Sequence, residues 1–324
     1  MNRLLRLALA LAAAAWLGVA GLTLRQWHRT APEDAPQVTV VVPKGASLAQ
    51  TAAALERAGA IDDARRFRLA ARILGNGRPI RAGEYRVPKG AGYAQLLDAL
   101  TDGAAVQHQI VIPEGLPSVM VADRLAAEPL LTGAVPPLAE GSVLPQGYSF
   151  ERGEARARVA QRMQAAMAAT LKELWPRRSP RTVVKSPAEA VTLASIVEKE
   201  TGVAAERRMV AAVYSNRLRV GMKLDADPTI IYPITRGRPL GRRILLSEKT
   251  AVNGYNTYTR PGLPVGPIAN PGRESIAAVL DPAETDALYF VADGKGGHVF
   301  AATLAEHQRN VARWFALRRQ RGEM

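Results

Sequence analysis

The residues best suited to acid–base chemistry are glutamates near the end of a predicted helix, Lys185–Thr201. Ser186 and Glu189 form a Ser-x-x-Glu capping box, and Pro187 suits the first helical position. The run that follows is apolar on nearly every side, which is typical of a helix buried in a core. The sequence therefore predicts a core helix that carries carboxyl groups near its C-terminal end.

Glu198 shares a helical face with the small apolar residues Val191 and Ala194. A carboxyl held there would resist ionisation and suit a general acid. The alternative is a solvated helix end, because Glu198 is followed by Lys199 and Glu200. Periodicity does not exclude Glu200 either, since it lies on the opposite face. Helical geometry thus nominates a carboxyl without choosing one.

Composition limits the remaining chemistry. The 324 residues include no Cys and four scattered His, so a disulfide framework and a thiolate nucleophile are excluded and we expect no metal site. The net charge of +14 is spread along the chain without an aromatic-interleaved patch, which argues against a nucleic-acid partner. An acidic cell-wall polymer would suit this charge, although a genome that favours Arg would also explain it.

An uncharged, mostly apolar run at Leu7–Leu24 follows a short basic tail. About eighteen helical residues span a thin hydrocarbon core, so we predict a single transmembrane helix at residues 7–24 after a cytoplasmic tail at 1–6. A cleaved signal peptide is the alternative, because Gly18-Val19-Ala20 would serve as a cleavage site. Residues 25–37 are expected to form a linker.

A strand, a Pro-x-Gly turn and a helix recur three times in the region 38–131, which predicts small α+β modules. The turns are Val42–Gly45, Val87–Gly90 and Ile112–Gly115, and the helices are expected at residues 48–58, 93–100 and 119–127. Carbohydrate binding and a plain spacer are both consistent with such modules.

The loop Asn253–Asn270 is the strongest candidate for substrate contact, because Gly and Pro restrict its backbone. Asn256, Tyr258 and Asn270 offer amides and a hydroxyl that suit sugar hydroxyl and N-acetyl groups. A structural loop is the alternative, with the Asn side chains bonded to the backbone. Asp227 precedes a proline, where an Asx turn or helix cap is the common role.

The second half of the chain resembles the endolytic murein transglycosylases of the YceG-like family. The motifs that carry the resemblance occur in the family's order: Leu193–Thr201, Asn216–Leu218, Gly221-Met222, Asp227–Thr229, Tyr255–Tyr258, Gly262–Pro264, Pro267–Gly272 and Tyr289–Gly294. The resemblance implies that the first Glu of its motif, Glu198, is the catalytic acid. From the residues themselves we expect Asn256, Tyr258, Asp227 and Asn270 to bind substrate. Gln146 departs from the pattern, since related sequences carry an acid there, and we assign that stretch no role.

The resemblance also implies an α+β fold with a LysM-like region at 38–131 and a mixed helical and β catalytic domain at 132–324. The expected reaction cleaves the β-1,4 bond between N-acetylmuramic acid and N-acetylglucosamine within nascent strands and leaves 1,6-anhydro ends, which limits strand elongation. It needs no cofactor.

The implied location is the inner membrane, with a single-pass anchor and the catalytic part in the periplasm. Peptidoglycan strands and peptidoglycan synthases are the expected partners. Alternatives are a non-catalytic peptidoglycan-binding protein, a lysozyme-like hydrolase and a pyridoxal-phosphate lyase.

Overall fold

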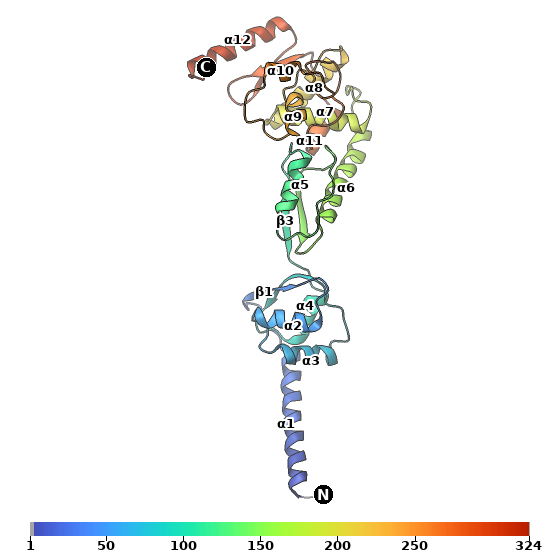
Figure 1. Cartoon of the computed structure of the whole chain (residues 1–324), viewed down its shortest axis with the longest axis vertical. Coiled ribbons are helices and arrows are strands. Elements are labelled where there is room, and N and C mark those ends of the chain that lie inside the picture. The colour runs from blue at the N-terminus through green and yellow to red at the C-terminus, as the bar shows by residue number, and fades with distance from the viewer. Residues whose placement is uncertain (1–2, 324) are drawn as a thin grey trace. The chain divides into compact units, whose positions relative to one another are not determined.

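A computed structural model describes residues 3–323 as a mixed α and β chain that divides into two compact units. The first unit comprises the residues up to His108 together with Ser149–Glu154, and the second comprises Gln109–Tyr148 and the residues from Ala155 onward. The α+β class is confirmed. Figure 1 labels the elements.

The first unit begins with the long helix α1. Its elements are α1 (Arg3–His28), β1 (Gln37–Val42), α2 (Leu48–Arg57), α3 (Ala64–Leu74), β2 (Gly83–Pro88) and α4 (Tyr93–Thr101). Within the described residues, one helical stretch, Leu9–His28, is long and apolar enough to cross a membrane, a property that a signal sequence near the N-terminus shares. The predicted span at residues 7–24 lies within α1.

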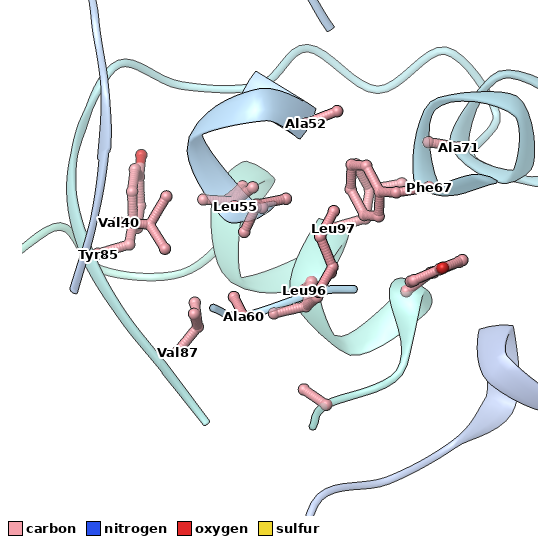
Figure 2. Close-up of a cluster of buried hydrophobic side chains, with 14 of the residues drawn as sticks. Val40, Ala52, Leu55, Ala60, Phe67, Ala71, Tyr85, Val87, Leu96 and Leu97 are labelled. Carbon is pink, nitrogen blue, oxygen red and sulfur yellow. The ribbon is translucent and has the colours of Figure 1, made fainter. Parts of the chain in front are cut away.

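Strands β1 and β2 pair antiparallel, and helices α2, α3 and α4 pack around an apolar cluster, as Figure 2 shows. Leu55, Phe67, Val87 and Leu96 are fully buried in that cluster. Phe67 packs edge-on against Tyr93 with ring centroids 5.3 Å apart, which is a favourable aromatic geometry. This unit therefore has a hydrophobic core of its own.

The second unit holds the remaining elements. They are α5 (Ser118–Ala127), α6 (Arg156–Leu174), α7 (Pro187–Glu200), α8 (Arg207–Arg219), α9 (Pro228–Thr235), α10 (Leu246–Thr250), α11 (Arg273–Leu280), the strands β5 (Tyr289–Ala292) and β6 (His298–Ala301), α12 (Leu304–Gln320), and short 3₁₀ turns at Trp175–Arg177 and Ala204–Glu206. Strands β3 (Gln107–Val111) and β4 (Gly147–Glu151) pair with each other, and the boundary between the units runs through them.

The core of the second unit forms where α7 packs on α8 and α11. Leu193 and Ile196 of α7, Val210 of α8 and Ile276 of α11 are all fully buried there. Strands β5 and β6 form an antiparallel hairpin, and Thr303 and Glu306 form a capping box at the start of α12. Helix α7 is thus buried in the core, as the sequence predicted.

All three predicted strand–turn–helix repeats form. Their turn glycines, Gly45, Gly90 and Gly115, have φ of 75°, 79° and 70°, a region that favours glycine. The repeats do not share one compact unit, because α5 of the third repeat packs within the second unit rather than with the first two. The likeness of this region to LysM stays a prediction.

Candidate active site

Helix α7 begins as its sequence predicts. Ser186 Oγ accepts a 3.2 Å hydrogen bond from Glu189 N, and Glu189 Oε2 accepts one of 2.6 Å from Lys185 N. Near the other end, Ser195 Oγ accepts a 3.0 Å bond from Ile268 N and so ties the candidate substrate loop to the helix. The helix therefore places two carboxyl groups, Glu198 and Glu200, against a fixed framework.

Glu198 contacts a cationic side chain and a backbone N–H group. Its side chain is 6% exposed, and its Oε1 lies 3.8 Å from Arg207 Nη2. Its Oε2 accepts a 2.9 Å hydrogen bond from Gly272 N. These contacts tie the end of α7 to α8 and to the start of α11.

Glu114 lies beside Glu198 and shares its arginine. Arg207 Nη2 donates a 3.0 Å hydrogen bond to Glu114 Oε2. Burial, and then the nearby charge of Glu198, raises the pKa of Glu114. A Cβ on Gly272 would overlap Glu114 Oε1, so a side chain at residue 272 would displace the Glu114 carboxyl group. These four residues join α7, α8, the turn before α5 and the start of α11.

Glu200 lines a cavity of about 430 Å³, large enough for a sugar-sized ligand. Its Oε1 is shielded from solvent and has no hydrogen-bond partner. Burial raises the pKa of Glu200 to about 7, although a side-chain hydrogen bond with Tyr214 acts in the opposite direction. Glu200 is therefore a carboxyl that keeps its proton close to neutral pH.

Asp227 and Tyr258 line the same cavity as Glu200. Tyr258 Oη donates a 2.7 Å hydrogen bond to Asp227 Oδ1. Burial, and then this hydrogen bond, raises the pKa of Tyr258, so its hydroxyl stays protonated. Lys249 Nζ lies 4.4 Å from the centroid of the Tyr258 ring, within the range of a cation–π contact. Asp227 and Tyr258 are thus positioned together beside a neutral carboxyl.

Asn256 and Asn270 are fully buried and use their polar atoms inside the protein. Asn256 Nδ2 lies 2.8 Å from Ala251 O, and Asn256 Oδ1 accepts a 3.0 Å bond from Tyr258 N. Asn270 Oδ1 accepts a 3.0 Å bond from Val143 N. The structure therefore brings Asp227 and Tyr258 to the Glu200 cavity, and places the two asparagines in the framework behind it.

Glu140 belongs to this framework and was missed by the sequence reasoning. Its Oε1 accepts a 2.9 Å hydrogen bond from Ser118 N and lies 3.4 Å from Asn270 Nδ2. Burial raises the pKa of Glu140. The sequence reasoning also missed Arg207 and Glu114, although Glu114 lies in the predicted turn Ile112–Gly115.

A second hollow of 440 Å³ opens on the other side of α9. It is mostly apolar, and its lining includes Glu114, Lys199, Met120, Ile231 and Leu240. Among residues 3–323, no group of three or more His, Asp or Glu side chains is arranged to hold a metal ion. The groups available for chemistry in this unit are therefore carboxyls, hydroxyls and cationic side chains.

Comparison with known proteins identifies relatives over most of the chain. A model of the YceG-like family matches residues 40–313. The endolytic murein transglycosylase of Bacillus subtilis (strain 168) is 27% identical over 317 residues, covering 88% of this chain and 86% of the relative. That of Streptococcus pneumoniae serotype 2 (strain D39) is 28% identical over 324 residues, covering 85% of this chain and 58% of the relative, so this chain spans little more than half of it.

A solved structure shows a related fold. The 2.6 Å crystal structure of a yceG-like protein from Listeria monocytogenes superposes with a TM-score of 0.52 at 27% identity. The match covers 84% of this chain and 98% of the Listeria chain. The family model alone extends over much more than half of the sequence, and it includes every carboxyl discussed above. The protein belongs to the YceG-like family.

Proposed function

We propose that this protein cleaves peptidoglycan glycan strands as a lytic transglycosylase. Two similar proteins carry the name endolytic murein transglycosylase, and the chain shares the family over residues 40–313. The observation that carries the chemistry is the buried carboxyl of Glu200, whose pKa of about 7 lets it hold a proton at neutral pH. An acid of this kind is what protonation of a glycosidic oxygen requires.

A lytic reaction needs only one carboxyl to move protons. Glu200 donates its proton to the leaving glycosidic oxygen while the bond from that oxygen to the anomeric carbon breaks. The 6-hydroxyl of the same muramyl residue then attacks that carbon, and its proton passes to the Glu200 carboxylate. The products are a strand with a free 4-hydroxyl and a strand with a 1,6-anhydro end, and the acid is restored.

Asp227 and Tyr258 act beside this acid. The hydrogen bond from Tyr258 Oη fixes Asp227 Oδ1, and both side chains line the Glu200 cavity. Asp227 adds negative charge near Glu200, and this charge also favours the protonated acid. In this role the two residues contact the sugar and stabilise the positive charge that develops at the anomeric carbon.

Glu198, which the family resemblance nominated, is the alternative acid. Its two oxygens already contact Gly272 N and Arg207, whereas Glu200 lines a cavity. Comparing substitutions at the two positions separates the proposals. Each of Glu198→Gln and Glu200→Gln removes one carboxyl at nearly constant volume.

The finer features of the reaction are part of the same proposal. The bond cleaved is the β-1,4 bond between N-acetylmuramic acid and N-acetylglucosamine within a nascent strand. Helix α1 anchors the protein in the inner membrane, and the units that follow lie in the periplasm, close to the peptidoglycan synthases whose strands it shortens. The long apolar stretch Leu9–His28 supports this arrangement.

The decisive experiment incubates the full-length protein, in detergent, with purified peptidoglycan and identifies the products by mass spectrometry. We expect anhydromuramyl ends from the wild type and from Glu198→Gln, and none from Glu200→Gln. Loss of products only in Glu198→Gln would make Glu198 the acid. Reducing ends would identify a hydrolase, and strands that bind without being cut would identify a peptidoglycan-binding protein.

A further inference from the structure

A cationic hollow adjoins the Glu200 cavity. It has a volume of 610 Å³ and shares Asp227 with that cavity. The other residues that line it come from α9, from α10 and from the segment between them: Ile231, Arg242, Arg243, Ile244, Leu245, Leu246 and Lys249. A substrate held at Glu200 would therefore present its nearest substituents to this hollow.

The charges of the hollow do not cancel. Arg242 Nη1 donates a 2.9 Å hydrogen bond to Glu248 Oε2, and Asp227 is bonded to Tyr258, so these two carboxylates already have partners. Arg243 is exposed, and among residues 3–323 its guanidinium has no described hydrogen bond or ion pair. The hollow thus retains cationic groups, from Arg243 and Lys249, that are available to an anion.

Lys249 connects this hollow to the catalytic groups. Its ammonium lies 4.4 Å from the ring centroid of Tyr258, whose hydroxyl is bonded to Asp227. An anion bound at Lys249 would therefore sit beside the aromatic ring that faces the reacting sugar. The contact with the ring also limits where the ammonium can point, and less side-chain entropy is lost when it binds.

We propose that this hollow binds a carboxylate carried on the lactyl branch of the muramyl residue, which would make Arg243 and Lys249 specificity-determining residues. The inference rests on the proposed function. The sugar hydroxyl and N-acetyl groups are neutral, so a cationic wall gains little from the glycan backbone itself. The negative charge of the strand lies on the lactyl branch, either as its free carboxylate or in the carboxylates of an attached peptide.

Three strand preparations separate the two sources of that charge. One keeps its peptides, a second has the peptides removed enzymatically so that the lactyl carboxylate is free, and a third has all carboxylates converted to neutral amides. We expect the wild-type KM to be about fivefold higher for the amidated strands than for the charged strands, because amidation removes one exposed charge pair. Whichever of the two charged strands has the lower KM carries the carboxylate that the hollow binds.

The variant Arg243→Gln gives the sharpest test, because its side chain has no described partner to lose. We expect its KM to rise about fivefold on charged strands, with kcat retained and no change on amidated strands. Lys249→Gln should behave similarly. The control is Arg313→Gln. Arg313 is exposed on α12 and lines a different hollow, so this variant removes the same charge and should leave KM unchanged. Equal losses on charged and amidated strands would overturn the proposal.

Two further results would decide against the hollow as a substrate site. Leu245 and Leu246 are exposed beside Arg243, so a membrane surface is the competing occupant. Loss of binding to anionic lipid vesicles in Arg243→Gln, with KM unchanged, would assign the surface to lipid. Binding of the three strand preparations is also measured with Glu200→Gln, so the preference for carboxylates is tested independently of cleavage. If no preparation yields anhydro ends, that result refutes the proposed function but not the carboxylate site.

Discussion

Glu198 and Glu200 are two residues apart on α7 and lie in opposite electrostatic environments. Glu198 Oε2 accepts a hydrogen bond from Gly272 N, and its Oε1 faces Arg207. Glu200 Oε1 is buried without a partner, and burial raises the pKa of this residue to about 7. One helix thus provides a carboxyl that contacts two neighbouring elements and a second carboxyl, with a raised pKa, that lines a cavity.

The pH dependence of kcat/KM should show the titration of Glu200, the proposed acid. Glu200 must be protonated to act, so we expect the rate to fall as pH rises through about 7. A buffer series on soluble strand fragments measures this limb. A rate that stays constant from pH 6 to about 8.5 would contradict a donor with this pKa.

The same group makes stability depend on pH. The pKa of Glu200 is raised from 4.5 to about 7 in the folded protein, so its protonated form is the one that folding favours. The stability of the wild type relative to Glu200→Gln is therefore highest below about 4.5 and falls as pH rises through about 7. Thermal unfolding of both proteins over this range checks the sign, since an ordinary exposed glutamate would show no such trend.

Substitution of Glu198 should mainly lower the free energy of unfolding. Glu198→Gln keeps an acceptor for Gly272 N but removes the charge facing Arg207, so we expect a loss of about 1–3 kcal/mol in the free energy of unfolding. Glu173→Gln is the matched control, because its pair with Arg273 is exposed and should contribute much less to stability. Denaturant unfolding measures both. Equal stability of Glu198→Gln and wild type would show that the buried contacts contribute nothing.

Local signals in the sequence predicted much of this fold. The Ser186 cap and the glycine turns of the three repeats depend on residues close in sequence, and all form. The division into units was not predicted in this form, because the packing of the third repeat depends on contacts with distant segments.

The choice between the two carboxyls also depended on distant residues. Periodicity placed Glu198 and Glu200 on opposite faces, but it carried no information on what covers each face. The partners of Glu198 come from residues 207 and 272, and the wall opposite Glu200 includes Tyr258 and Tyr289. Only the tertiary fold brings these groups together. Asn256 and Tyr258 likewise share a short motif, yet one is buried and the other lines the cavity.

Removal of the Tyr258 hydroxyl should impair catalysis more than folding. Tyr258→Phe loses the bond to Asp227 and keeps the ring beside Lys249, so we expect kcat/KM to fall about tenfold, equivalent to about 1.4 kcal/mol. The control is Tyr289→Phe, which removes a hydroxyl from another wall of the same cavity. Similar losses in both variants would show that the Tyr258–Asp227 pair has no particular role.

The buried amide of Asn256 should stabilise the loop that carries Tyr258. Its Nδ2 lies 2.8 Å from Ala251 O and 3.0 Å from Lys249 O, so Asn256→Ala leaves buried carbonyls without a donor and should cost about 2–3 kcal/mol in the free energy of unfolding. Asn253→Ala, in the same loop, removes only a side-chain acceptor for two backbone N–H groups and should cost about 1 kcal/mol. Thermal unfolding and glycan binding are measured on each variant. If Asn256→Ala unfolds like the wild type but binds strands less tightly, the side chain contacts substrate, as the sequence predicted, and the loop is held by its glycines and prolines instead.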